Sequence, residues 1–196
     1  MLELKNICFS ADGKQILKDI NLRIDDAKFI VITGPNGSGK STLARIISGI
    51  LTPDSGQILL DGEDITALGI TERARKGISF AFQQPVRFKG VAVKDLICLA
   101  SGQDLSTADA CQYLSEVGMC AKDYIDREVN ASLSGGELKR IEIATVMARK
   151  TKLTLFDEPE AGIDLWSFGN LISVFEKMHR ETSGTIIIIS HQERIL

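Results

Sequence analysis

Residues Gly34–Ser41 read Gly-Pro-Asn-Gly-Ser-Gly-Lys-Ser, which is a complete phosphate-binding loop. Glycines let the backbone curl so that successive N–H groups can point at phosphate oxygens, where a Cβ would stand in the way. Lys40 brings a positive charge within reach of the β- and γ-phosphates of a nucleotide, and the hydroxyl of Ser41 can bind Mg²⁺. The loop therefore predicts a site for a nucleoside triphosphate.

The segments on both sides of this loop are those that such a site needs. Phe29–Thr33 is an apolar, β-branched run and predicts a buried strand. After the loop, Leu43, Ile46, Ile47 and Ile50 recur at helical spacing. The phosphates would then lie at a helix N-terminus, where free N–H groups and the positive end of the helix dipole favour an anion. A chance match does not explain strand, loop and helix together.

Two carboxylates, Asp157 and Glu158, end a second apolar segment, Leu153–Phe156. At the end of a strand, Asp157 can complete the Mg²⁺ shell, and Glu158 can accept a proton from an attacking water. Taken alone, the pair could also be a solvated acidic turn before Pro159. The phosphate loop upstream favours the catalytic interpretation.

A third motif, Ser-Leu-Ser-Gly-Gly-Glu, ends at Glu137 and precedes a helical pattern that runs to Arg149. Ser134 and Glu137 can form a capping box for that helix. Capping does not require Gly135 and Gly136, which weaken a helix start and are tolerated where a ligand comes close. A bare backbone beside a serine hydroxyl is a second anion site. One nucleotide does not need two such sites in one chain, unless the two sites act on different nucleotides.

The rest of the chain predicts an α/β core. Glu3–Phe9 and Gln15–Ile24 are expected to be strands joined by a turn at residues 12–13, and Thr185–Ile189 is expected to be a buried parallel strand. Residues 85–131 have helical spacing instead. We expect residues 1–84 and 132–196 to form the nucleotide-binding core, with an N-terminal antiparallel β subdomain, and residues 85–131 to form an inserted helical lobe.

Composition narrows the class of protein. The 196 residues carry a formal charge of −3, so no basic field indicates nucleic acid as a partner. No apolar stretch approaches the length of a membrane span, and the N-terminus lacks the layout of a secretory signal. These features predict a cytoplasmic protein that reaches a membrane only through a partner. The cysteines lack Cys-x-x-Cys spacing and are expected to pack in a reducing compartment. They are Cys8, Cys98, Cys111 and Cys120.

Together these motifs resemble those of the ATP-binding cassette (ABC) ATPases, and the resemblance runs along essentially the whole chain. The Walker A loop matches Gly34–Ser41, the signature motif Leu133–Glu137 and the Walker B strand Leu155–Glu158. Gln83, after the apolar run Ile78–Phe82, matches the glutamine that senses Mg²⁺ and the attacking water. Ala161–Asp164 resembles the D-loop, and His191 the switch histidine that contacts the γ-phosphate.

The resemblance implies an α/β P-loop NTPase of ABC type that hydrolyses ATP with Mg²⁺ as a homodimer. The signature of one copy would close over the ATP held by the Walker A loop of the other, head to tail. Glu158 would act as the base, Lys40 and His191 would stabilise charge on the γ-phosphate, and Ser41, Gln83 and Asp157 would hold Mg²⁺. The implied nucleotide contacts are Gly34, Pro35, Asn36, Gly37, Ser38, Gly39, Lys40, Ser41, Thr42, Ser134, Gly135, Gly136, Glu137 and Asp164.

Within the family, three segments resemble the SufC-like ATPases of SUF iron–sulphur cluster assembly: Phe82–Val91, Gly135–Glu142 and His191–Leu196. Ala11 stands where most transporter ATPases stack an aromatic residue on adenine, and the SUF group also lacks that residue. Against this, Asp157–Glu160 keeps the proline of ordinary transporter ATPases. The implied partner is a soluble SUF scaffold. The alternative is a membrane permease, with this chain as the membrane-peripheral nucleotide-binding subunit.

The family also predicts where a partner binds. In the family, a helix of the partner docks beside the glutamine, so we expect Pro85–Lys89 and Val91–Leu96 to form that dock here. DNA-repair and translation ATPases carry a coiled coil, a zinc module or a second cassette that this sequence lacks, so these classes are disfavoured. Family members usually continue beyond the switch histidine, whereas this sequence stops five residues after His191.

Overall fold

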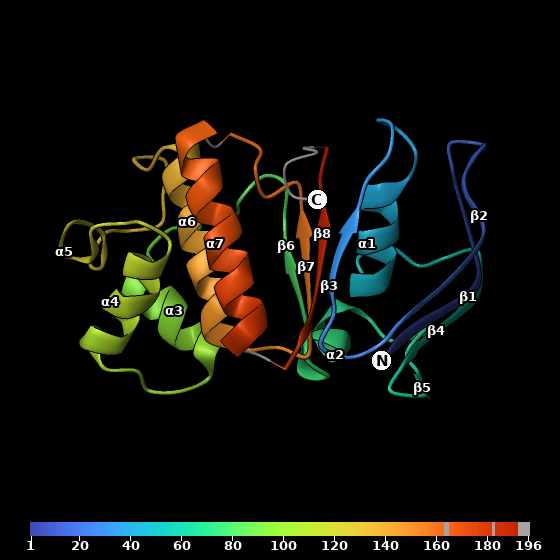
Figure 1. The fold of residues 1–196 in the computed structure, drawn as a ribbon, viewed down its shortest axis with the longest axis horizontal. Coiled ribbons are helices and arrows are strands. Elements are labelled where there is room, and N and C mark those ends of the chain that lie inside the picture. The colour runs from blue at the N-terminus through green and yellow to red at the C-terminus, as the bar shows by residue number, and fades with distance from the viewer. Residues whose placement is uncertain (163–164, 182, 192–196) are drawn as a thin grey trace. The chain divides into compact units, whose positions relative to one another are not determined.

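The computed structural model describes residues 1–162, 165–181 and 183–191, without the side chains of residues 165–168 and 170 (Figure 1). The chain divides into two compact units. The first unit comprises Met1–Phe80, Thr151–Asp157 and Ser183–Leu196. The second unit comprises Ala81–Lys150 and Glu158–Thr182.

An antiparallel sheet begins the first unit. Its strands lie in the order β2-β1-β4-β5. Their bounds are β1 Leu2–Ala11, β2 Lys14–Ile24, β4 Ser55–Leu60 and β5 Glu63–Asp64. The predicted turn joins β1 to β2, because Asp12 and Gly13 both have positive φ, 50° and 74°. Two such residues between paired strands match the right-handed twist of a hairpin. β1 starts one residue earlier and ends two residues later than the predicted Glu3–Phe9, whereas β2 starts one residue earlier than predicted and ends at Ile24 as predicted.

The second sheet of this unit has the order β3-β8-β7-β6. Its strands are β3 Phe29–Ile32, β6 Ile78–Ala81, β7 Leu153–Asp157 and β8 Thr185–Ile189. β3 and β7 both run parallel to β8. Every residue of β7 and β8 is buried, as expected of parallel strands covered on both faces. Burial is therefore confirmed for the runs Leu153–Phe156 and Thr185–Ile189, whereas β3, predicted to be buried, is half-buried along its whole length.

Helix α1, Lys40–Ser48, starts immediately after the glycine-rich loop and is shown beside β3 in Figure 1. Leu43, Ile46 and Ile47 are buried and pack in one apolar cluster with residues of β7 and β8. The spacing of these three residues thus marks the face of α1 that enters the core, whereas Ile50, the fourth predicted position, lies beyond the end of the helix and is half-buried.

Helix α2, Ile70–Arg75, carries a charged side chain that the sequence pattern does not distinguish from its solvated neighbours. Arg73 is only 1% exposed. Its guanidinium donates to the carbonyl oxygens of Ile46 (2.6 Å), Ile47 (3.0 Å) and Thr66 (2.9 Å), and its Nε donates to that of Leu68 (2.9 Å). Burial lowers the pKa of Arg73. A cation thereby satisfies carbonyls at the C-terminal end of α1, where the helix dipole favours positive charge.

The second unit is helical. Its helices are α3 Val93–Ser101, α4 Thr107–Glu116, α5 Ala121–Tyr124, α6 Gly135–Arg149 and α7 Leu165–Glu181. α3 and α4 pack against α6, whose buried side includes Leu138 and Ile141. Helices α3 to α5 fall within residues 85–131, and the compact unit also takes in α6 and α7. Across the parts of the chain that the structure describes, no helix has the length and apolarity needed to cross a membrane.

Candidate functional site

The phosphate loop lies between β3 and α1 in the first unit. Lys40 Nζ donates to the carbonyl oxygens of Gly34 and Pro35, each at 2.8 Å. The loop needs glycine at its end for two reasons: Gly39 caps α1 with φ 92°, and a Cβ there would lie 2.7 Å from Leu17 Cδ2. The side chain of Lys40 is therefore held on the loop itself, next to the N–H groups that open α1.

Ser41, the second residue of α1, contacts the acidic end of β7. Its Oγ donates to Asp157 Oδ1 at 2.7 Å. Asp157 is 1% exposed, and its Oδ2 is buried without a hydrogen-bond partner among the described residues. A buried carboxylate oxygen with no donor requires compensation, and a hydroxyl and a carboxylate are ligands that Mg²⁺ prefers. These two residues therefore fit a magnesium site.

Strand register places the phosphate loop, Asp157 and His191 at one edge of the parallel sheet. Ile189 of β8 pairs with both Ile32, the last residue of β3, and Asp157, the last residue of β7. The phosphate loop follows Ile32, and the exposed His191 follows Ser190 just beyond β8. Ligands of open α/β sheets bind at this carboxyl edge. Loop, acidic residue and histidine thus share one edge within the first unit.

Gln83 and Glu158 form a second group, in the second unit. The Nε2 of Gln83 donates to Glu158 Oε2 at 2.5 Å, across 75 residues of sequence. Glu158 has φ 47°, a left-handed conformation that is uncommon for a residue with a side chain. Such strain persists where the surrounding structure imposes it, and it clusters at functional sites. The structure thus brings together the predicted base and the predicted water-sensing glutamine.

The capping box at the start of α6 is confirmed. Ser134 Oγ accepts from the Glu137 N–H at 3.3 Å, and Glu137 Oε2 accepts from the Ser134 N–H at 2.6 Å. Tyr124 donates its hydroxyl to Glu137 Oε1. The Tyr124 hydrogen bond, followed by those from Ser134, lowers the pKa of Glu137 to about 2. Tyr124 also lies 5.1 Å below the guanidinium carbon of Arg127. Sequence reasoning missed Tyr124, because nothing local links it to the motif.

The two glycines of this motif have no packing reason to be glycine. A Cβ at Gly135 would meet nothing within 4 Å, and at Gly136 it would make an ordinary 3.6 Å contact with the Gly162 carbonyl. Neither residue has the positive φ that favours glycine. The bare first turn of α6 therefore fits the close approach of a ligand.

The remaining predicted positions are Thr42, Asp164 and the four cysteines. Thr42 follows Ser41 in α1 and is half-buried. Asp164 lies outside the described residues. Three cysteines are half-buried, Cys120 is exposed, and all four are free. Within the described ranges, no three His, Cys, Asp or Glu side chains gather as metal ligands.

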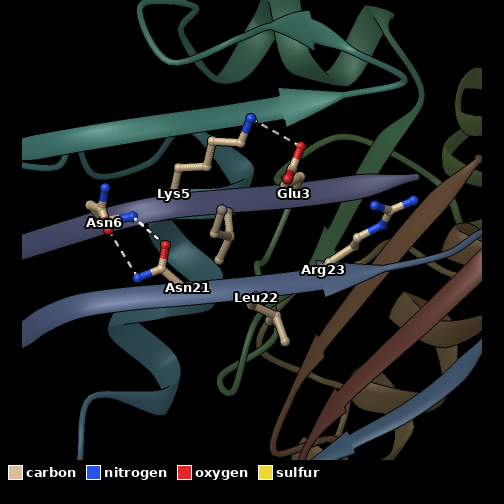
Figure 2. Close-up of a pocket in the computed structure, with 7 residues that line it drawn as sticks. Glu3, Lys5, Asn6, Asn21, Leu22 and Arg23 are labelled. Atoms are coloured by element: carbon tan, nitrogen blue, oxygen red, sulfur yellow. Dashed lines mark hydrogen bonds and ion pairs between the residues drawn. The ribbon is translucent and has the colours of Figure 1, made fainter.

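A hollow of about 520 Å³ lies on the antiparallel sheet, away from all of these motifs in sequence (Figure 2). Four of its polar side chains pair with one another: Lys5 with Glu3 at 3.4 Å, and Asn21 with Asn6 at 3.0 Å. The lining residues are Glu3, Leu4, Lys5, Asn6, Asn21, Leu22 and Arg23. No residue of the phosphate loop lines it, so it is not the predicted nucleotide site.

Comparison with known proteins agrees with these motifs. Residues 17–161 match the family described as ABC transporter. An uncharacterised ABC transporter ATP-binding protein of Methanocaldococcus jannaschii is 36% identical over 203 residues, which cover all of this chain and 81% of that protein.

Solved structures show the same fold. A cassette from Clostridium perfringens, part of an ABC transporter complex, is 30% identical with a TM-score of 0.77, over all of this chain and 80% of that one. An ATP-binding cassette solved as a dimer bound to ADP and Pi is 24% identical, with a TM-score of 0.87 over all of this chain and 90% of that one. Members of the family bind ATP, generally with Mg²⁺. The chain belongs to the ABC transporter ATP-binding family, with the fold of an ABC-type P-loop NTPase and the activity of an ATP hydrolase.

Proposed function

We propose that two copies of this chain bind two Mg-ATP molecules head to tail, and that hydrolysis drives a conformational change in a membrane permease. The observation that supports this proposal is that one chain has two glycine-containing helix starts, the phosphate loop before α1 and the bare first turn of α6, each of which suits an anion. Each feature is half of a site, and a second copy supplies the complementary half. Dimeric cassettes among the solved relatives support this arrangement.

The side chains divide the work of hydrolysis. Lys40 and His191 stabilise charge on the γ-phosphate, and Gln83 orients the water beside Glu158. Glu158 takes a proton from that water as the water oxygen bonds to the γ-phosphorus. The bond to the β–γ bridging oxygen breaks, and ADP leaves with the bonding electrons. Ser41, Asp157 and Gln83 would hold Mg²⁺, which would neutralise part of the phosphate charge.

The permease is favoured as partner because the named relatives are ABC transporter ATP-binding proteins. We place the dock at Pro85–Lys89 and Val91–Leu96, where Val86 and Phe88 are exposed apolar side chains. Residues 85–131 would be the inserted lobe that carries this dock, between core segments 1–84 and 132–196. The ATPase is then membrane-peripheral through its partner.

A soluble SUF scaffold is the second candidate. Three segments, Phe82–Val91, Gly135–Glu142 and His191–Leu196, resemble SufC-like ATPases, and Ala11 stands in place of an adenine-stacking aromatic. Affinity purification from native membranes and lysate separates the two candidates. A polytopic membrane protein supports the permease, whereas a soluble pair with iron–sulphur absorbance supports the scaffold.

The head-to-tail arrangement is tested by complementation between two inactive variants. Lys40→Ala removes the loop charge, and Ser134→Arg blocks the first turn of α6. A mixed pair contains one intact site, formed by the Lys40 of one copy and the Ser134 of the other. We expect the mixture to regain ATPase activity that neither variant has alone. A mixture that stays as inactive as its components would reject the shared site.

A further inference from the structure

Lys139 is a charged residue without access to water. It lies in α6 within the charged run Glu137–Glu142, yet its side chain is 0% exposed. Its Nζ donates to the carbonyl oxygen of Phe82 and forms an ion pair with Glu142 Oε2 at 3.0 Å. The carboxylate of Glu142 is itself only 14% exposed.

The same ion pair holds the other polar group of the Phe82 backbone. Glu142 Oε1 accepts a hydrogen bond from the Phe82 N–H at 2.9 Å. Burial raises the pKa of Glu142, and the attraction of Lys139 opposes that rise. Lys139 and Glu142 therefore bind both the N–H and the C=O of one residue, 57 and 60 positions earlier in the chain.

Stability alone does not explain such a pair, since well-packed apolar residues often stabilise a fold as well as a buried ion pair does. Here the two charges bind the backbone of Phe82 at the point where β6 has just ended, at Ala81. The next residue is Gln83, whose amide donates to Glu158 at 2.5 Å. The ion pair thus fixes the peptide unit from which the Gln83 side chain extends.

We propose that Lys139 and Glu142 form a backbone clamp on Phe82 that positions Gln83 against Glu158. They are positioning residues for hydrolysis, and neither touches the reacting atoms. Because α6 begins at the Ser134 cap, the clamp also ties the helix of the signature motif to the glutamine segment. This inference rests on the roles proposed above for Gln83 and Glu158.

Hydrogen exchange at the Phe82 amide tests the clamp without any turnover. In the nucleotide-free protein, Glu142→Ala should accelerate exchange of this amide, because its acceptor is gone. Glu142→Gln, which keeps an acceptor oxygen, should accelerate it less. Glu116→Ala is the matched control, since Glu116 also pairs with a lysine, Lys177, and is also 14% exposed. Unchanged protection of Phe82 in Glu142→Ala would overturn the clamp.

A double-mutant cycle tests whether the clamp acts through Gln83. Lys139→Met, an apolar replacement of similar length, should lower kcat by roughly 10- to 100-fold, as expected for a displaced orienting group. The Kd for ATP, measured by binding, should stay within about twofold. In a Gln83→Ala background, adding Lys139→Met should lower kcat only slightly further.

Full additivity of the two losses, or full activity of Gln83→Ala alone, would overturn the positioning role. If the wild-type chain hydrolyses no ATP, the proposed function fails, and the exchange experiment still decides whether the clamp exists. The two failures are therefore distinguishable.

Discussion

The hydroxyl of Ser41 donates to the buried carboxylate of Asp157 at 2.7 Å, although 116 residues separate the two in sequence. One oxygen of Asp157 has this donor, and the other is buried without one among the described residues. The contact joins the first turn of α1 to the end of β7. The hydrogen bond from Ser41 compensates the negative charge of Asp157 only in part, and a bound cation would complete the compensation.

Replacing the charge of Asp157 should raise the thermal stability of the chain and lower its ATPase activity. Asp157→Asn keeps the size of the side chain and removes a buried, half-compensated charge, so we expect Tm to rise. Mg-ATP turnover should fall by about 10²-fold or more, because a group that organises phosphate charge is lost. Thermal unfolding and an ATPase assay measure the two effects. A drop in Tm together with retained turnover would contradict this account of the site.

Glu158→Gln should bind ATP and fail to hydrolyse it. The amide keeps the shape of the side chain and cannot take a proton from water, so we expect turnover to fall by about 10²–10³-fold. The unhydrolysed nucleotide should hold the dimer together, which size-exclusion chromatography with and without ATP can measure. Wild-type turnover in this variant would remove Glu158 as the base.

Gly135→Ala tests whether the bare turn of α6 serves a ligand. Gly135 is helical and a Cβ there meets nothing, so the substitution should leave Tm unchanged or slightly raised. ATPase activity should nevertheless be lost, because the methyl group would occupy the space that the nucleotide enters. Gly169→Ala, at another open helical glycine in α7, is the control and should keep full activity. An active Gly135→Ala protein would refute this reason for the glycine.

Arg73→Met should lower the free energy of unfolding by about 3 kcal/mol, since it leaves buried carbonyls without donors. Denaturant unfolding measures the change. Arg75→Met, two residues away on the exposed side of α2, should change it by less than about 0.5 kcal/mol. Equal effects of the two substitutions would show that the buried guanidinium is not the stabilising feature.

Acid should weaken the cap of α6 as the pH falls from 4.5 toward about 2. The pKa of Glu137 is about 2 in the folded chain against an ordinary 4.5, so the ionised form is stabilised by folding. Its contribution is complete above pH 4.5 and is lost as the pH falls from there toward 2. Tyr124→Phe removes the largest cause of the shift and should raise the pKa of Glu137, as NMR titration can measure. An unchanged pKa would contradict the role assigned to Tyr124.

The sequence by itself predicted the structural features that short segments of the chain encode. The glycine-rich loop, the capping box at Ser134 and the hairpin turn at residues 12–13 each depend on a few adjacent residues, and the structure shows all three. Runs such as Leu153–Phe156 also predicted their own burial, because both faces of a parallel strand are apolar.

Tertiary structure alone decided which charges are buried and what they hold. Arg73 and Lys139 lie among charged neighbours and resemble solvated helix surfaces in sequence, yet both are inaccessible to water. Arg73 donates to four backbone carbonyls and Lys139 to the carbonyl of Phe82, and every residue type offers such carbonyls, so no pattern of side chains marks these contacts in advance. The physical reason is that periodicity reports which face of an element is apolar, whereas a buried ion is placed by the carbonyls that surround it.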